Sequence, residues 1–208
     1  MRNGPAISGN PAQTKENSPR WICRLAGRPG ILLAFLWGLA EGTLFFVVPD
    51  VLLSLVAMLE PRRCWKHIAA ATSGSLLAAA LVYGYAQQNS RRAAEAVERM
   101  PFVNSKMFSK VEASYRAHGI GAVFLAPYSG IPYKVYAVEA PPVARELPFL
   151  AATIPARAGR FVLVCLVFGL PAAWFRRVWN WSRRSLVAIH AMVWAVFYAF
   201  YWSAIGKM

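Results

Sequence analysis

The stretch Glu41-Gly-Thr-Leu-Phe-Phe-Val-Val-Pro49-Asp50-Val-Leu-Leu53 decides the fold, because it places a proline and two carboxylates inside an apolar run. A second stretch, Ala126-Pro127-Tyr-Ser-Gly130-Ile-Pro132-Tyr133-Lys134-Val135-Tyr136, is interrupted in the same way beside a lysine. A charge at the centre of a bilayer costs about 2.5–3.5 kcal/mol on insertion scales. A proline there frees backbone groups that lipid cannot satisfy. Two such segments predict re-entrant hairpins of the kind found in transporters.

The composition of the chain favours an integral membrane protein over a soluble one. Of its 208 residues, 57% are hydrophobic and 15% are charged, whereas soluble domains have about 45–50% and about 25%. The formal net charge is +14. Because the basic residues flank apolar segments, this charge favours contact with anionic lipid over nucleic acid.

Cysteine and histidine give no sign of a metal site or a cofactor. The three cysteines are widely spaced, and the three histidines lack the spacing of metal ligands. We therefore expect no metal, no cofactor and no disulfide framework, with the histidines in packing or loop positions. These residues are Cys23, Cys64, Cys165, His67, His118 and His190.

Three parts are expected along the chain: a polar tail with a basic interfacial helix (1–29), a membrane domain (30–175), and a basic connection with a C-terminal transmembrane helix (176–208). Residues 1–20 are polar and predict disorder. The fold class is all-α integral membrane, with two re-entrant broken-helix hairpins and about three transmembrane helices in a pseudo-repeat.

The predicted repeat consists of a broken segment followed by a spanning helix in each half. In order, the expected elements are a hairpin (31–59), a helix (67–86), an amphipathic surface helix interrupted at Pro101 (90–118), a second hairpin (119–140), and spans at 148–175 and 185–205. Pro49, Gly130 and Pro132 are the predicted structural breaks. One alternative stays open for the first hairpin: a single kinked transmembrane helix with Asp50 near its middle.

Charges at membrane depth are separated by sign between the two halves. Glu41 and Asp50 belong to the first half, and Lys134, Arg157 and Arg160 to the second. If the halves face each other, acidic groups meet basic groups at the interface. These pairs either hold the fold together or form a site, in which a carboxylate carries protons and the arginines bind an anion such as a lipid phosphate.

Three blocks of this sequence resemble the YqaA branch of the DedA-like membrane proteins, also called SNARE-associated or VTT-domain proteins. The blocks are Glu41 to Leu53, the Ile-Pro-Tyr-Lys-Val run inside Pro127 to Val138, and Arg157-Ala-Gly-Arg160-Phe161. The resemblance covers residues 30–175. It implies two facing re-entrant loops, a bacterial inner membrane location, and Glu41, Asp50, Lys134, Arg157 and Arg160 as transport and substrate-binding residues.

The function expected from this resemblance is translocation or scrambling of lipids or lipid-phosphate carriers, in some relatives coupled to the proton-motive force. The partners are then membrane lipids, anionic or phosphate-bearing, with protons as an optional second partner. The alternative is a non-catalytic membrane scaffold or assembly factor. We expect no enzyme activity, because the sequence contains neither Gly-x-Ser-x-Gly nor His-Glu-x-x-His.

Basic residues also predict the orientation. The predicted side that carries the N-terminus holds twelve lysines and arginines and the other side holds eight. This bias favours a cytoplasmic N-terminus. The sequence assigns no oligomeric state.

Overall fold

The structure is a computed structural model that describes residues 20–44, 47–100 and 103–205. Every regular element in those ranges is a helix, so the predicted all-α class is confirmed. The disorder expected for residues 1–20 lies almost wholly outside the described residues. The elements are α1 (Arg20–Leu25), α2 (Arg28–Thr43), α3 (Asp50–Leu59), α4 (Pro61–Gln88), α5 (Ser90–Glu98), α6 (Ser105–His118), η1 (Gly119–Gly121), α7 (Ala122–Leu125), η2 (Ala126–Tyr128), α8 (Tyr133–Val138), α9 (Glu146–Val178) and α10 (Arg183–Ile205).

Among the described residues, three helices are long and apolar enough to cross a membrane: α4, α9 and the Arg183–Ser203 part of α10. They confirm the three predicted spans and indicate an integral membrane protein. At a rise of 1.5 Å per residue, α9 is about 50 Å long and exceeds the roughly 30 Å of a hydrocarbon core. Pro155 and Pro171 lie inside α9 without ending it.

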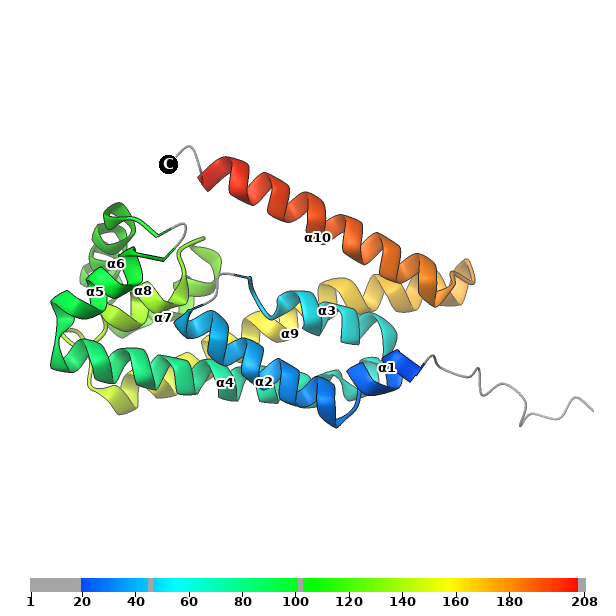
Figure 1. The fold of residues 1–208 in the computed structure, drawn as a ribbon, viewed down its shortest axis with the longest axis horizontal. Coiled ribbons are helices and arrows are strands. Elements are labelled where there is room, and N and C mark those ends of the chain that lie inside the picture. The colour runs from blue at the N-terminus through cyan, green and yellow to red at the C-terminus, as the bar shows by residue number, and fades with distance from the viewer. Residues whose placement is uncertain (1–19, 45–46, 101–102, 206–208) are drawn as a thin grey trace, which may run out of the picture.

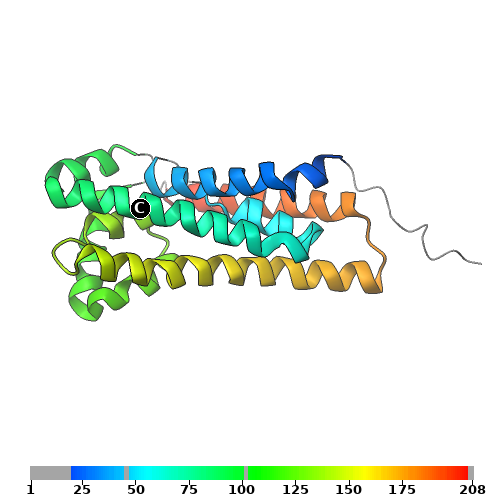
Figure 2. The ribbon, with the colours of Figure 1, turned by 90° about the horizontal axis from the view of Figure 1, so that it is seen from below.

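The first broken segment is a hairpin of two helices that run in opposite directions (Figures 1 and 2). Helix α2 ends at Thr43, where the hydroxyl donates to the Leu39 carbonyl at 2.8 Å. Helix α3 begins at Asp50, directly after Pro49. The chain reverses between them, so the alternative of one kinked helix is wrong. The first helix also ends earlier than the apolar run to Val48 predicts.

Helix directions follow from the contacts that each helix makes. Helices α2 and α4 run parallel, since Gly30 lies against His67 and Gly42 against Ala78. Helix α9 runs opposite to α4, because Arg157 contacts Ser75 whereas the later Cys165 contacts the earlier Cys64. Helix α3 runs in the same direction as α9, because Asp50 contacts Arg160 and Ala57 lies beside Gly169. It packs against both α9 and α4. Two helices thus run one way and two run the other, and α2, α3, α4 and α9 form a bundle with one apolar interior (Figure 2).

Small residues let α2 and α4 approach closely. A Cβ atom on Gly38 would lie 2.3 Å from the carbonyl oxygen of Ala71, and one on Gly74 would lie 2.0 Å from that of Phe35. Only a residue without a side chain fits such spacing, which is how helices associate in lipid.

Helices α5 and α6 form a cap at one end of the bundle, around α8 (Figure 1). Two separate helices replace the single stretch 90–118, in agreement with the predicted interruption. The apolar face of the cap is buried in the protein, where the Tyr115 hydroxyl donates to the Tyr136 carbonyl at 2.9 Å. The apolar face of the expected surface helix therefore packs against α8 and α4. The cap residues in this core include Ala93, Val97, Val111 and Tyr115.

The second broken segment consists of short pieces. Gly130 adopts a left-handed conformation with φ 73°, and Pro132 precedes α8 at its N-terminus. This confirms that residues 119–140 cannot form one continuous helix. All six residues of α8 are buried. Helix α8 has 6 residues and α3 has 10, so the helices that follow the two breaks differ in length.

Substitution of Gly74 by alanine should loosen the contact between α2 and α4. The new Cβ would meet backbone atoms, so we expect a loss of about 1–3 kcal/mol in the free energy of unfolding. A Cβ atom on Gly84 of the same helix would have no neighbour within 4 Å, so Gly84→Ala should not destabilise. Thermal unfolding in detergent measures both. Equal melting temperatures for Gly74→Ala and Gly84→Ala would contradict the close approach.

Candidate functional site

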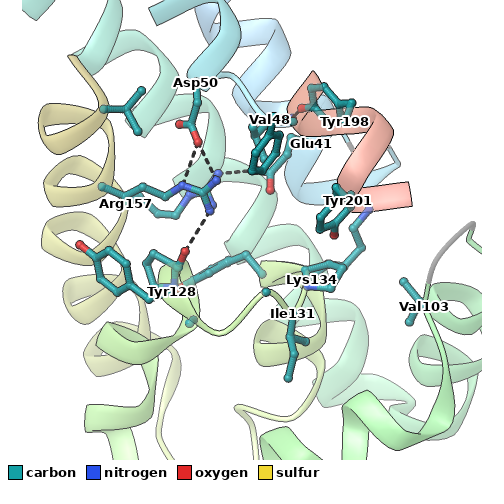
Figure 3. A pocket seen from close by; sticks show the side chains of 18 of the residues that line it. Glu41, Val48, Asp50, Val103, Tyr128, Ile131, Lys134, Arg157, Tyr198 and Tyr201 are labelled. Carbon is teal, nitrogen blue, oxygen red and sulfur yellow. Dashed lines mark hydrogen bonds and ion pairs between the residues drawn. The ribbon is translucent and has the colours of Figure 1, made fainter. Parts of the chain in front are cut away.

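A cavity of about 490 Å³ lies where the two broken segments meet α9 and α10. All five predicted site residues line it: Glu41, Asp50, Lys134, Arg157 and Arg160. Figure 3 shows Glu41, Asp50 and Lys134 reaching it from different elements, with Tyr198 and Tyr201 of α10 at its edge. Of the predicted structural breaks, Gly130 and Pro132 also line the cavity, whereas Pro49 is buried beside it.

Arg157 forms a buried ion pair with Glu41. Its guanidinium donates to the Glu41 carboxylate and, at 3.1 Å, to the Ser75 hydroxyl. The two side chains are 2% and 7% exposed. The rings of Tyr133 and Phe161 lie 5.2 and 5.0 Å from the guanidinium carbon. Aromatic faces and a carboxylate together offset much of the cost of burying this cation.

Arg160 forms the second pair, with Asp50. Its Nε and one terminal nitrogen donate to Asp50 Oδ2 at 2.9 and 2.6 Å, and the other terminal nitrogen donates to the Pro127 carbonyl at 3.3 Å. Arg160 thus joins α9 to both broken segments. Asp50 is the first residue of α3, where the helix dipole also favours a negative charge.

One oxygen of Asp50 is left without a hydrogen bond. Both donors from Arg160 go to Oδ2, and Oδ1 is buried with no partner among the described residues. A buried acceptor without a partner costs about 1–3 kcal/mol. This oxygen belongs to a residue that lines the cavity, so it is available to a bound proton or a hydrogen-bond donor.

Lys134 reaches from the start of α8 to the end of α2. Its ammonium group lies 3.4 Å from the Thr43 carbonyl oxygen and 3.3 Å from the sulfur of Met100. Thr43 is the last residue of α2, and a cation is favourable at the C-terminal end of a helix. Lys134 is 3% exposed. It therefore adds a third cation to the cavity wall and ties the two broken segments together.

Helix α10 closes one side of the cavity with aromatic side chains. The Tyr198 hydroxyl accepts a hydrogen bond from the Val48 backbone N–H at 3.1 Å. Deeper along the helix, Ser54 of α3 contacts His190 at 2.8 Å and Trp194 at 3.1 Å. His190 is in a packing position, as expected. The outer face of α10 exposes large apolar side chains, including Met192, Val196 and Phe200.

Several residues that complete this site are not identified by the sequence. In the sequence, Ser75 is only a small residue of a transmembrane helix. Nothing in the sequence links Tyr133 to an arginine. Tyr133 is held by a 2.6 Å hydrogen bond with Thr153. Tyr198 and Trp194 belong to a span with several other aromatic residues, so periodicity gives no reason to choose them.

The arrangement is suited to holding an amphiphile. Charged groups from four elements occupy one part of the wall, and apolar side chains such as Leu44, Leu163, Val164 and Phe197 occupy the rest. Within the described ranges no three His, Cys, Asp or Glu side chains are grouped in a way that would hold a metal ion. The expectation that acidic groups of the first half meet basic groups of the second is confirmed by both ion pairs.

Comparison with protein-family models, with curated proteins and with solved structures finds no match to this chain.

Removal of Arg157 should destabilise the protein strongly, because Glu41 would remain buried without a counter-charge. We expect Arg157→Met to lower the free energy of unfolding by about 3–5 kcal/mol. The double variant Glu41→Gln/Arg157→Met should recover most of that loss. Chemical denaturation in detergent gives these values.

The matched control is Arg116, which pairs with Glu112 on the exposed surface of the cap. Arg116→Met should cost less than about 1 kcal/mol. A double variant no more stable than Arg157→Met alone would refute the assignment of an energetically coupled pair.

Proposed function

We propose that this protein translocates or scrambles lipids or lipid-phosphate carriers across a membrane. The observation that carries the proposal is the cavity in which two arginine–carboxylate pairs share their walls with apolar side chains. Its volume of about 490 Å³ is within the range of small-molecule sites. The two broken segments act as re-entrant loops, and no bond of the lipid is made or cleaved.

The charged part of the wall suits a phosphate-bearing headgroup. Arg160 is 23% exposed, more than the other ionised side chains of the two pairs. Its guanidinium geometry favours bidentate contacts with phosphate oxygens. Lys134 supplies a further cation at the same wall. Acyl chains would follow the apolar lining toward α10, whose outer face is suited to lipid.

Asp50 is the proposed site of proton coupling. A proton on Oδ1 would satisfy the atom that has no partner and would weaken the pair with Arg160. Arg160 would then be available to a headgroup. Arg160 would then exchange the Asp50 carboxylate for the phosphate of the headgroup. Proton binding to Asp50 would thereby be coupled to substrate binding.

We further propose, on the sequence resemblance, that the protein is a member of the YqaA branch of the DedA-like family and lies in the bacterial inner membrane. Helix α1 and the turn between α9 and α10 lie at the same end of the molecule (Figure 1), and this end carries more basic residues than the cap end. This end is the proposed cytoplasmic side. Its described basic residues are Arg20, Arg24, Arg28, Arg62, Arg63, Lys66, Arg176, Arg177, Arg183 and Arg184.

A non-catalytic membrane scaffold is the second candidate function. It is favoured by the fact that both arginines of the cavity are already neutralised by carboxylates. In that case the ion pairs hold the two halves together, and the cavity transports nothing. The two candidates differ in one measurable property, the transfer of lipid between leaflets.

Lipid transfer is measured with fluorescent phospholipids and a lipid-phosphate carrier in proteoliposomes, with and without an imposed proton gradient. The intact protein should accelerate transfer. Asp50→Asn and Arg160→Gln should each reduce the rate of lipid transfer by about tenfold or more. A tenfold change corresponds to about 1.4 kcal/mol in the activation free energy of transfer.

Glu112→Gln on the cap is the control and should keep the rate of the intact protein. Each variant is used only after its melting temperature shows that it folds. Absence of transfer by the intact protein for all lipids would favour the scaffold, and full activity in both site variants would dismiss the site.

The orientation can be tested with the native thiol of Cys23, which is exposed on α1. A membrane-impermeant maleimide should label Cys23 in inverted membrane vesicles but not in intact spheroplasts. Cys64 and Cys165 are buried and should stay unlabelled in both. Labelling of Cys23 in intact spheroplasts would place the basic end outside.

A further inference from the structure

Two buried cysteines from opposite halves of the chain lie in contact. Cys64 belongs to the first turn of α4, and Cys165 lies within α9. Their Sγ atoms are 3.0 Å apart, although 101 positions separate the two residues in sequence. The residues are 5% and 9% exposed. Neither belongs to the cavity described above.

The surroundings leave both sulfur atoms without a strong polar partner. Each Sγ lies 3.7 Å from the same carbonyl oxygen, that of Leu53 in α3. Thiols are weak donors, and these contacts are long. A disulfide has an S–S length of about 2.05 Å, so the two atoms need to approach by only about 1 Å to bond.

We propose that Cys64 and Cys165 form an oxidation site that closes to a disulfide on reaction with an uncharged hydroperoxide. One thiol attacks the peroxide and becomes a sulfenic acid, with release of an alcohol, or of water when the oxidant is hydrogen peroxide. The second thiol then displaces the hydroxyl group as water and forms the S–S bond. In this reaction the two thiols lose two hydrogens and the peroxide bond is reduced.

The environment selects the chemical class of the oxidant. The pair is packed in an apolar cluster with Leu53, Val56 and Phe161. Entry of a charged oxidant into such surroundings is strongly unfavourable. An apolar hydroperoxide, such as the oxidised acyl chain of a lipid, partitions into the membrane beside α9. The bond would tie α4 to α9 covalently, and its formation does not depend on lipid translocation.

The test uses the full chain with Cys23→Ser, which removes the exposed thiol, treated in detergent with cumene hydroperoxide. Trypsin is expected to release residues 64–66 and 161–176 as separate peptides, since Arg63, Lys66, Arg160 and Arg176 bound them. After oxidation and without reductant, these two peptides should appear as one species, lighter than their sum by two hydrogens, about 2 Da. Reduction should restore the two separate peptides.

Two single variants in the same background, Cys64→Ser and Cys165→Ser, serve as controls and should give no joined species. The apolar peroxide should act at a lower concentration than a charged oxidant such as tetrathionate. The proposal is overturned if both peptides are fully alkylated after oxidation and unfolding, or if each cysteine is oxidised to a sulfinic acid without joining.

Discussion

The rest of the structure depends on the buried ion pair between Arg157 and Glu41. An arginine that is 2% exposed is tolerated only when a nearby opposite charge compensates its own. Glu41 lies near the end of α2 and Arg157 in the middle of α9, so the pair fixes how far these helices slide along each other. The rings of Tyr133 and Phe161 lie over the guanidinium, and Tyr133 thereby holds α8 against α9.

Close packing between α2 and α4 makes this pair possible. Ser75 of α4 and Glu41 of α2 contact the same guanidinium nitrogen, so their two helices must lie side by side. Gly38 and Gly74 permit that approach. Close packing of α2 on α4 and the ion pair of Arg157 therefore do not contribute independently to the stability of the bundle. A side chain on either glycine would move the acceptors of Arg157 as well as the backbone.

The second pair, Asp50 with Arg160, differs from the first in ways that bear on function. Arg157 is enclosed by aromatic rings, whereas Arg160 is partly exposed and Asp50 has one oxygen without a partner among the described residues. A fully enclosed pair holds two helices together, whereas the partly exposed Arg160 can be reached by another partner. Within one cavity, the structure thus combines a contact suited to scaffolding with a contact suited to binding.

The sequence by itself determined the all-α membrane class, the three long spans, the breaks at Pro49 and Pro132, and the charges that line the cavity. These follow from local properties: run length, proline and glycine, and the sign of each charge. Only the tertiary structure decided which acid pairs with which arginine, that the cap faces protein instead of lipid, and that Cys64 meets Cys165. These contacts depend on the direction and register of the helices. Residues far apart in sequence determine both together, so no local sequence pattern predicts them.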